Sequence, residues 1–380
     1  MTKAAREMPP LDTFSGLLLT LTALSGEFPA DLLGRLPSAD SYKEFAVKQL
    51  KRENLLRTYY RDGVRGLRLT STAKKLLLAN HSDRFYPYLS GAAETNRLKS
   101  EITRRLRLHR IAEVLVTMLN AGVSAFPWEK PAVFQPVPPP PDTRIDRPAW
   151  FSSREVKEIG PQRSMIRGSR AVGVLLTGGD IFVVYNTGAS EMSWEFRAEL
   201  RLKTLLKTDL CHARLPAQFR NAQQSAIVFA ADMGWIAAFM GAHDHGDHDY
   251  FVLDGEFEHF YSLTSDHHGE VMLQLLCDPD EQATLDAVLA EDLSAPQPGL
   301  VVENDAMDGD DPVLFGYTCD MPRIKRFDNA LHIHDKQGTL YCFDFQEDAL
   351  RAVCGPNVSI RVIDFDAYEG SVFHSEEETD

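Results

Sequence analysis

The sequence predicts a chain of mixed α and β structure in two parts. In the smaller N-terminal part three helices precede a β-hairpin, and in the larger C-terminal part strands and helices alternate. Three observations predict this arrangement: helical spacing of apolar residues followed by two short strand-like runs, a proline-rich stretch that divides the chain, and a charge balance that changes sign along it. At 380 residues the chain is long enough for two or three domains.

The charge is distributed unevenly. Residues 1–115 hold 20 Lys/Arg and 12 Asp/Glu, a balance of +8, whereas the remainder holds 20 and 43, a balance of −23. The net charge of −15 would by itself argue against a nucleic-acid partner. The asymmetry is instead typical of a basic nucleic-acid module joined to an acidic domain.

The first two helices are short. Residues 14–24 are apolar over a helical length and stop at Ser25-Gly26. Residues 30–36 predict a second helix, because Pro29 stands close to its first turn, where proline is tolerated.

A third helix begins near residue 40, and a hairpin follows it. Ala46, Val47 and Leu50 are expected to face a core, and Asn54 to end the helix in a left-handed conformation. The runs LLRTYYR and LRLT are strand-like, and DGVRG between them predicts a tight turn. STAKKLLL then predicts another helix that begins at a Ser/Thr cap.

This order of elements resembles the winged-helix DNA-binding domain, most specifically at AVKQLKRENLL followed by GLRLTSTAKKLL. The resemblance implies a domain over residues 10–92 whose third helix enters the major groove of double-stranded DNA while the wing contacts the backbone. The residues it implies on these two elements are Ser41, Lys43, Lys48, Gln49 and Arg52 on the helix, and Arg61 and Arg65 on the wing. The alternative is a winged helix used only for protein contacts.

A basic helix is expected next, within a connecting segment at 93–125. Apolar residues recur at three- and four-residue spacing over 97–119, and Arg104 and Arg105 lie among four arginines in its middle. These arginines could extend a phosphate-contacting surface. Alternatively, the helix belongs to a bundle or dimer and its basic flank is simply solvated.

Residues 126–149 are expected to link the two parts. The stretch 136–148 contains six prolines in thirteen residues, which favours a stiff, extended spacer. We therefore place the domain boundary there.

Residues 150–372 predict an acidic mixed α/β domain, followed by an acidic tail at 373–380. Its clearest feature is a hairpin across Gly178-Gly179. A restriction-endonuclease-like core is an alternative for this domain. Asp180 opens a strand, but that strand carries no Glu-x-Lys, and Glu155-Val156-Lys157 lies on an expected helix, so such a core would be catalytically silent.

The loop GAHDHGDHDYF matches the pattern HxHxDH through His243, His245, Asp247 and His248, and so resembles the metal-binding signature of the metallo-β-lactamase superfamily. That site needs a hydrophobic strand running into the first histidine, and the preceding GWIAAFMGA indicates a helix end and a loop. We therefore predict a polar loop, no catalytic residues and no cofactor. A metal-dependent hydrolase or nuclease is the alternative function.

Two further histidines, His332 and His334, are expected to share one face of a short strand, where an i,i+2 pair could bind metal; a structural role is the alternative. No phosphate-binding glycine motif occurs, so nucleotide binding has no support in the sequence.

The chain also resembles the replication-relaxation family of bacterial plasmids and conjugative elements. The resemblance depends on the winged helix, then SSREVK, then the hairpin with VVYNTG and a following Trp194. It implies DNA binding in plasmid replication, mobilisation or their control, with a second copy of the chain or a replication or mobilisation protein as partner. A non-enzymatic interaction scaffold is the remaining alternative.

The cellular compartment is predicted from two observations. The start of the chain lacks a long apolar run, which argues against a membrane partner, and five scattered cysteines form no CxxC pair. We expect a cytoplasmic protein with free thiols.

Overall fold

The computed structural model combines helices with three β-sheets in the part of the chain that it describes. The described residues are 7–90, 100–159, 168–191, 194–241, 257–297 and 299–377. The chain forms two compact units, and each is considered by itself. Unit 1 comprises residues 1–120 and 125–130, and unit 2 comprises 121–124 and 131–380.

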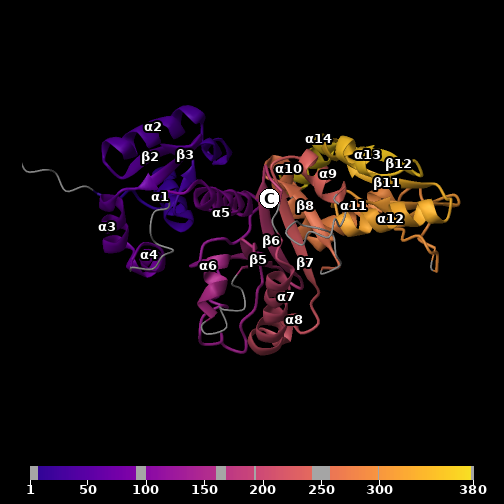
Figure 1. The fold of residues 1–380 in the computed structure, drawn as a ribbon, viewed down its shortest axis with the longest axis horizontal. Coiled ribbons are helices and arrows are strands. Elements are labelled where there is room, and N and C mark those ends of the chain that lie inside the picture. Colours follow the sequence, from indigo (N-terminus) through magenta and orange to yellow (C-terminus); the bar gives the residue numbers. More distant parts are fainter. Residues whose placement is uncertain are drawn as a thin grey trace, which may run out of the picture. The chain divides into compact units, whose positions relative to one another are not determined.

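Unit 1 is built around a small antiparallel sheet (Figure 1). Its elements are α1 (Phe14–Ser25), β1 (Phe28–Pro29), the 3-10 helix η1 (Asp31–Arg35), α2 (Asp40–Arg52), β2 (Leu56–Arg61), β3 (Val64–Leu69), α3 (Ser71–Asn80), α4 (Ser82–Leu89) and α5 (Ile102–Asn120). The strands lie in the order β1-β3-β2, so β3 is central. The predicted order of three helices, hairpin and helix is confirmed, and the two-residue strand β1 was not predicted.

Local sequence determines where these elements begin and end. Thr13 caps α1 by accepting a hydrogen bond from the amide of Gly16, and Thr70 caps α3 in the same way through Ala73. Asn54 follows α2 with a φ of 56°, so the predicted left-handed residue is confirmed. Asp62 and Gly63 also have positive φ, the combination that a two-residue hairpin turn requires.

The first sheet of unit 2 has five strands in chain order. They are β4 (Ala149–Ser152), β5 (Gly173–Leu176), β6 (Ile181–Gly188), β7 (Gln224–Ala230) and β8 (Phe260–Thr264). The first three pair antiparallel, and β6, β7 and β8 pair parallel. Leu176 pairs with Ile181, so the predicted hairpin across Gly178-Gly179 is confirmed. Because helices cover parallel strands, β7 is buried along its whole length.

The second sheet of unit 2 has four strands in the order β12-β11-β10-β9. These are β9 (Ala306–Asp308), β10 (Asp311–Phe315), β11 (Gly338–Phe343) and β12 (Val358–Ile363). One hydrophobic cluster includes residues from both sheets, such as Val183 and Leu340. The two sheets therefore share a core.

Helices of unit 2 connect and cover these strands (Figure 1). They are α6 (Ser153–Val156), η3 (Lys157–Ile159), α7 (Phe196–Leu205), the π-helix η5 (Leu206–Arg214), α8 (Pro216–Phe219), α9 (Met233–Gly241), α10 (His267–Cys277), α11 (Pro279–Leu289), α12 (Met321–Ile333), η6 (Asp344–Gln346), α13 (Glu347–Val353) and α14 (Phe365–Glu377). The expected strand at His332 and His334 is wrong: His332 lies in α12 and His334 caps its end.

The structure changes two expectations about the ends of unit 2. The proline-rich segment is not a free spacer, because Val133, Phe134 and Ile145 are buried in the core of unit 2 and both backbone polar groups of Ile145 bond to Gln218. Residues 373–377 of the expected acidic tail are helical, since α14 extends to Glu377.

Candidate nucleic-acid interface

Helix α2 has a buried face and an exposed face. Ala46, Val47 and Leu50 are buried, as predicted from their spacing. Four side chains on the opposite face follow one another at helical spacing and are exposed: Ser41, Phe45, Lys48 and Arg52. We call these four residues the α2 stripe.

The polar members of the α2 stripe differ in their contacts. Lys48 pairs with Glu44 across 3.0 Å, and both side chains remain 72% exposed. Arg52 forms no ion pair with a described residue. Gln49, at the edge of the stripe, donates to Glu53 at 2.9 Å. An exposed pair such as Lys48–Glu44 adds little stability, so Lys48 and Arg52 are both accessible to an external anion.

The hairpin β2–β3 contributes a second group of cations. Arg57, Arg61 and Arg65 are exposed, and only Arg61 has an acidic partner among the described residues, its neighbour Asp62 at 3.2 Å. Arg65 pairs with Tyr60 across the two strands, and Tyr60 is 68% exposed. The far end of the hairpin therefore presents cations beside an exposed aromatic ring.

Cations of α2, the hairpin and α3 lie near enough to repel one another, and no described acid pairs with them. Burial and then the nearby Arg65 lower the pKa of Lys51 in α2. Burial and then Arg57 lower the pKa of Lys74 in α3. None of these four cations forms an ion pair with a described residue. Each repulsion disfavours the charged form of the lysine, and a bound anion such as a phosphate would relieve both.

Two residues predicted for DNA contact are not at the surface. Lys43 is 6% exposed because it faces the core side of α2, where its Nζ donates to the carbonyl of Gly34 at 3.0 Å and to Asp40 at 3.1 Å. Arg105 is fully buried. Lys43 and Arg105 therefore do not belong to the candidate interface. Arg104 is exposed but pairs with Glu101 at 2.9 Å.

Arg105 belongs to a buried ion cluster that the sequence did not indicate. Its centre is Glu27, which has no exposed surface. The shortest contacts to the Glu27 carboxylate are 2.6 Å from Arg68 in β3, 2.6 Å from Arg105 and 3.0 Å from His109, the last two in α5. Burial alone would raise the pKa of Glu27, but the hydrogen bonds from His109, Arg105 and Arg68 outweigh it and hold the pKa at about 2.

The Glu27 cluster also holds the hairpin. Arg105 donates to the backbone carbonyls of Tyr59, Arg61 and Val64, at 3.3, 3.1 and 3.0 Å. The guanidinium groups of Arg68 and Arg105 lie 3.8 and 4.6 Å from the centre of the Tyr59 ring. Helix α5 thus positions the strands that carry Arg57, Arg61 and Arg65, although its own arginine does not reach the surface.

His243, His245, Asp247 and His248 lie outside the described residues, as does the whole segment 242–256. Elsewhere, within the described ranges, no group of three His, Cys, Asp or Glu side chains is arranged to hold a metal ion.

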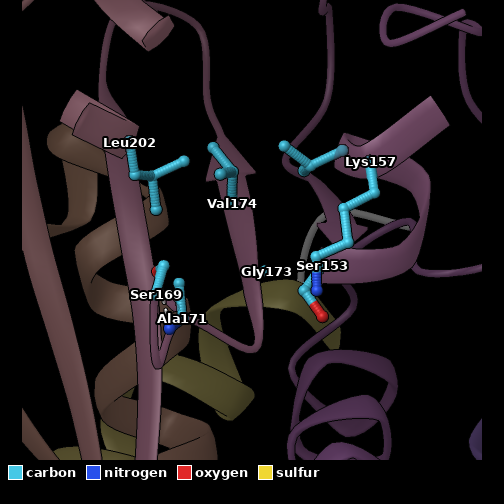
Figure 2. A pocket seen from close by; sticks show the side chains of 8 residues that line it. Ser153, Lys157, Ser169, Ala171, Gly173, Val174 and Leu202 are labelled. Atoms are coloured by element: carbon cyan, nitrogen blue, oxygen red, sulfur yellow. Dashed lines mark hydrogen bonds between the residues drawn. The ribbon is translucent and has the colours of Figure 1, made fainter. Parts of the chain in front are cut away.

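Unit 2 contains a shallow recess beside β5 (Figure 2). Figure 2 shows Val174 and Leu202 on one side and the side chain of Lys157 extending toward Ser153 on the other. Ser169 also lines it, but its hydroxyl donates to the buried Glu199. Glu155 and Ser152 form a capping box at the start of α6. The glutamate of the Glu-x-Lys sequence therefore caps a helix.

Comparison of the chain with family models, with curated proteins and with solved structures finds no match. Among the helices in the described ranges, none has the length and apolar character needed to span a bilayer.

Proposed function

We propose that the chain binds double-stranded DNA through unit 1, which we interpret as a winged-helix domain. The element order α1-β1-η1-α2-β2-β3 and the sheet order β1-β3-β2 support this interpretation. In such a domain α2 enters the major groove and the hairpin β2–β3 contacts the phosphate backbone. The α2 stripe and the hairpin arginines lie on these two elements.

The observation that carries the proposal is the set of exposed or half-buried cations without acidic partners. Lys51, Arg52, Arg57, Arg65 and Lys74 lie on α2, the hairpin and α3, and none is neutralised by a described residue. Residues 1–115 hold 20 Lys/Arg and only 12 Asp/Glu, so unit 1 carries a surplus of cations that its own acids do not neutralise. Their lack of partners fits a polyanionic ligand, which binds by exchanging its counterions for such groups.

We further propose that this binding serves the replication, mobilisation or control of a mobile genetic element, as the resemblance to the replication-relaxation family implies. Unit 2 would then provide contacts to a second copy of the chain or to a replication or mobilisation protein. Its acidic surface supports protein contacts over DNA contacts, because a strongly negative domain repels phosphate.

Binding of a labelled duplex by the full-length chain, followed by fluorescence anisotropy over a range of salt concentrations, tests the proposal. The double variant Arg52→Ala with Arg65→Ala should bind more weakly and lower the slope of log K against log salt by about 2, one unit for each lost phosphate contact.

The matched control removes two exposed arginines of unit 2, Arg197→Ala with Arg220→Ala, which also lack acidic partners among the described residues. This control changes the net charge by the same amount. An equal loss of affinity in both double variants would show that the effect comes from the net charge and not from the positions of Arg52 and Arg65. Absence of binding by the wild-type chain at low salt would favour the interaction scaffold.

A further inference from the structure

We infer that Phe45 reads the 5-methyl group of a thymine in the major groove, so that the DNA site of this chain contains a thymine opposite the middle of α2. The inference rests on the proposed function. A single exposed apolar side chain on a protein surface needs no explanation. Phe45 is distinguished by its position, because it occupies the centre of the otherwise polar α2 stripe.

The ring of Phe45 is more than half exposed and stacks on no aromatic ring among the described residues of unit 1. It is 54% exposed and makes no ring contact with another described residue. The adjacent Tyr42 is 48% exposed, but its ring meets Phe14 edge-on at 6.0 Å between centroids. Tyr42 is therefore held by an aromatic contact within unit 1, whereas Phe45 has no such contact among the described residues.

The residues around Phe45 favour a ligand that carries both negative charges and an apolar group. Lys48 and Arg52 follow it at i+3 and i+7 on the same stripe, and Ser41 precedes it by one turn. An apolar pocket of a protein partner would have to bury these two cations. The major groove presents phosphates at its edges and, on its floor, one apolar group, the thymine methyl, which aromatic and aliphatic side chains contact.

The test starts from duplexes that the full-length chain enriches from a random pool. Each thymine of an enriched duplex is then replaced singly by deoxyuridine, which lacks only the methyl group. The wild-type chain should lose roughly fourfold in affinity at one thymine or at two adjacent ones, the loss expected for one buried methyl group. Phe45→Ala should bind the thymine duplex more weakly and should bind the thymine and uracil duplexes equally.

Tyr86→Ala provides the matched control, because Tyr86 in α4 is another aromatic residue of unit 1 that is 62% exposed. This variant should keep the preference for thymine. Should Phe45→Ala alter hydrogen exchange in α2, Phe45→Gln replaces it, since glutamine preserves helix propensity.

Three outcomes would overturn the inference. The wild-type chain could tolerate uracil at every position, or a Phe45 variant could retain the preference for thymine; in both cases DNA binding stands and only the base contact fails. If no duplex is enriched at all, the proposed function fails together with the inference.

Discussion

Within the described residues, unit 1 and unit 2 each bury one carboxylate completely, and the surroundings shift the pKa values of these two groups in opposite directions. Glu27 accepts hydrogen bonds from two arginines and a histidine, and its pKa is lowered to about 2. Glu199 accepts from the hydroxyls of Ser169 and Tyr185, both at 2.8 Å, and from the amide of Arg170 at 2.7 Å. Burial outweighs these neutral donors and raises the pKa of Glu199.

The difference follows from what each carboxylate connects. Glu27 joins Arg68, Arg105 and His109, which come from β3 and α5 and lie 41 to 82 residues away in the chain. Glu199 lies in the first turn of α7 and binds Ser169 and Arg170, which precede β5, and Tyr185 in β6. The first is a charged junction between the proposed DNA-contacting hairpin and the helix behind it. At the second site, uncharged hydroxyl and amide donors bind the carboxylate inside an α/β core.

The largest expected effect is that of Glu27→Gln. It keeps the size of the side chain but leaves Arg68 and Arg105 with buried, uncompensated charge, which typically costs about 3–5 kcal/mol. Amide hydrogen exchange in β3 and α5 measures the loss locally. A change below about 1 kcal/mol would show that solvent reaches the two arginines.

The second prediction concerns acid. A group whose folded pKa is lowered stabilises the fold above its ordinary pKa and loses that contribution as the pH falls. Stabilisation by Glu27 should therefore be complete above pH 4.5 and decline toward pH 2, by roughly 3 kcal/mol in total. In hydrogen exchange of unit 1, the difference between the wild-type chain and Glu27→Gln should shrink over this interval. A difference that stays constant would contradict the lowered pKa.

The third prediction concerns Glu199→Gln, for which we expect a smaller loss of about 1–3 kcal/mol. The hydroxyls of Ser169 and Tyr185 can rotate to accept from the new amide group, and the remaining side-chain oxygen can still accept from the backbone amide of Arg170. Because the folded pKa of Glu199 is raised, the carboxyl stabilises the fold fully below its ordinary pKa of 4.5 and loses this contribution as the pH rises.

The difference between the wild-type chain and Glu199→Gln, read from hydrogen exchange in α7 and β6, should accordingly shrink as the pH rises, the reverse of the behaviour at Glu27. If Glu199→Gln lowered the free energy of unfolding as much as Glu27→Gln does, the proposed difference between the two sites would be wrong.

The comparison also shows where prediction from sequence stops. The exposed and buried faces of α2 follow from spacing alone, and so do the hairpin turn at Asp62-Gly63 and the left-handed Asn54. Those features depend on residues a few positions apart. The location of Arg105 depends on Glu27, 78 positions away, and a helix rich in arginine does not reveal which of them turns inward.

The same limit explains the other differences. Lys43 was assigned to the DNA surface by analogy of position, but the carbonyl of Gly34 and the Asp40 side chain hold it on the core side. Proline-rich composition predicted a spacer at 136–148, yet the buried Ile145 and its two hydrogen bonds to Gln218 attach that segment to unit 2. The composition of a segment predicts how stiff it is, but not which surface it packs against.

The smallest expected effect concerns exposed arginines, and it separates the two uses of arginine in unit 1. Arg68 and Arg105 are buried and hold the fold, whereas Arg52 and Arg65 are exposed and have no acidic partner among the described residues. Arg52→Ala with Arg65→Ala should therefore change the free energy of unfolding by no more than about 0.5 kcal/mol, the usual range for surface substitutions. Removing Arg65 also relieves its repulsion of Lys51, which would shift the balance slightly toward stabilisation. Urea unfolding and hydrogen exchange in β3 measure this change, and DNA titration of the same samples measures binding. A loss of affinity without a loss of stability would assign the exposed pair to the ligand. A loss of both would mean that Arg52 or Arg65 belongs to the fold, as Arg105 does.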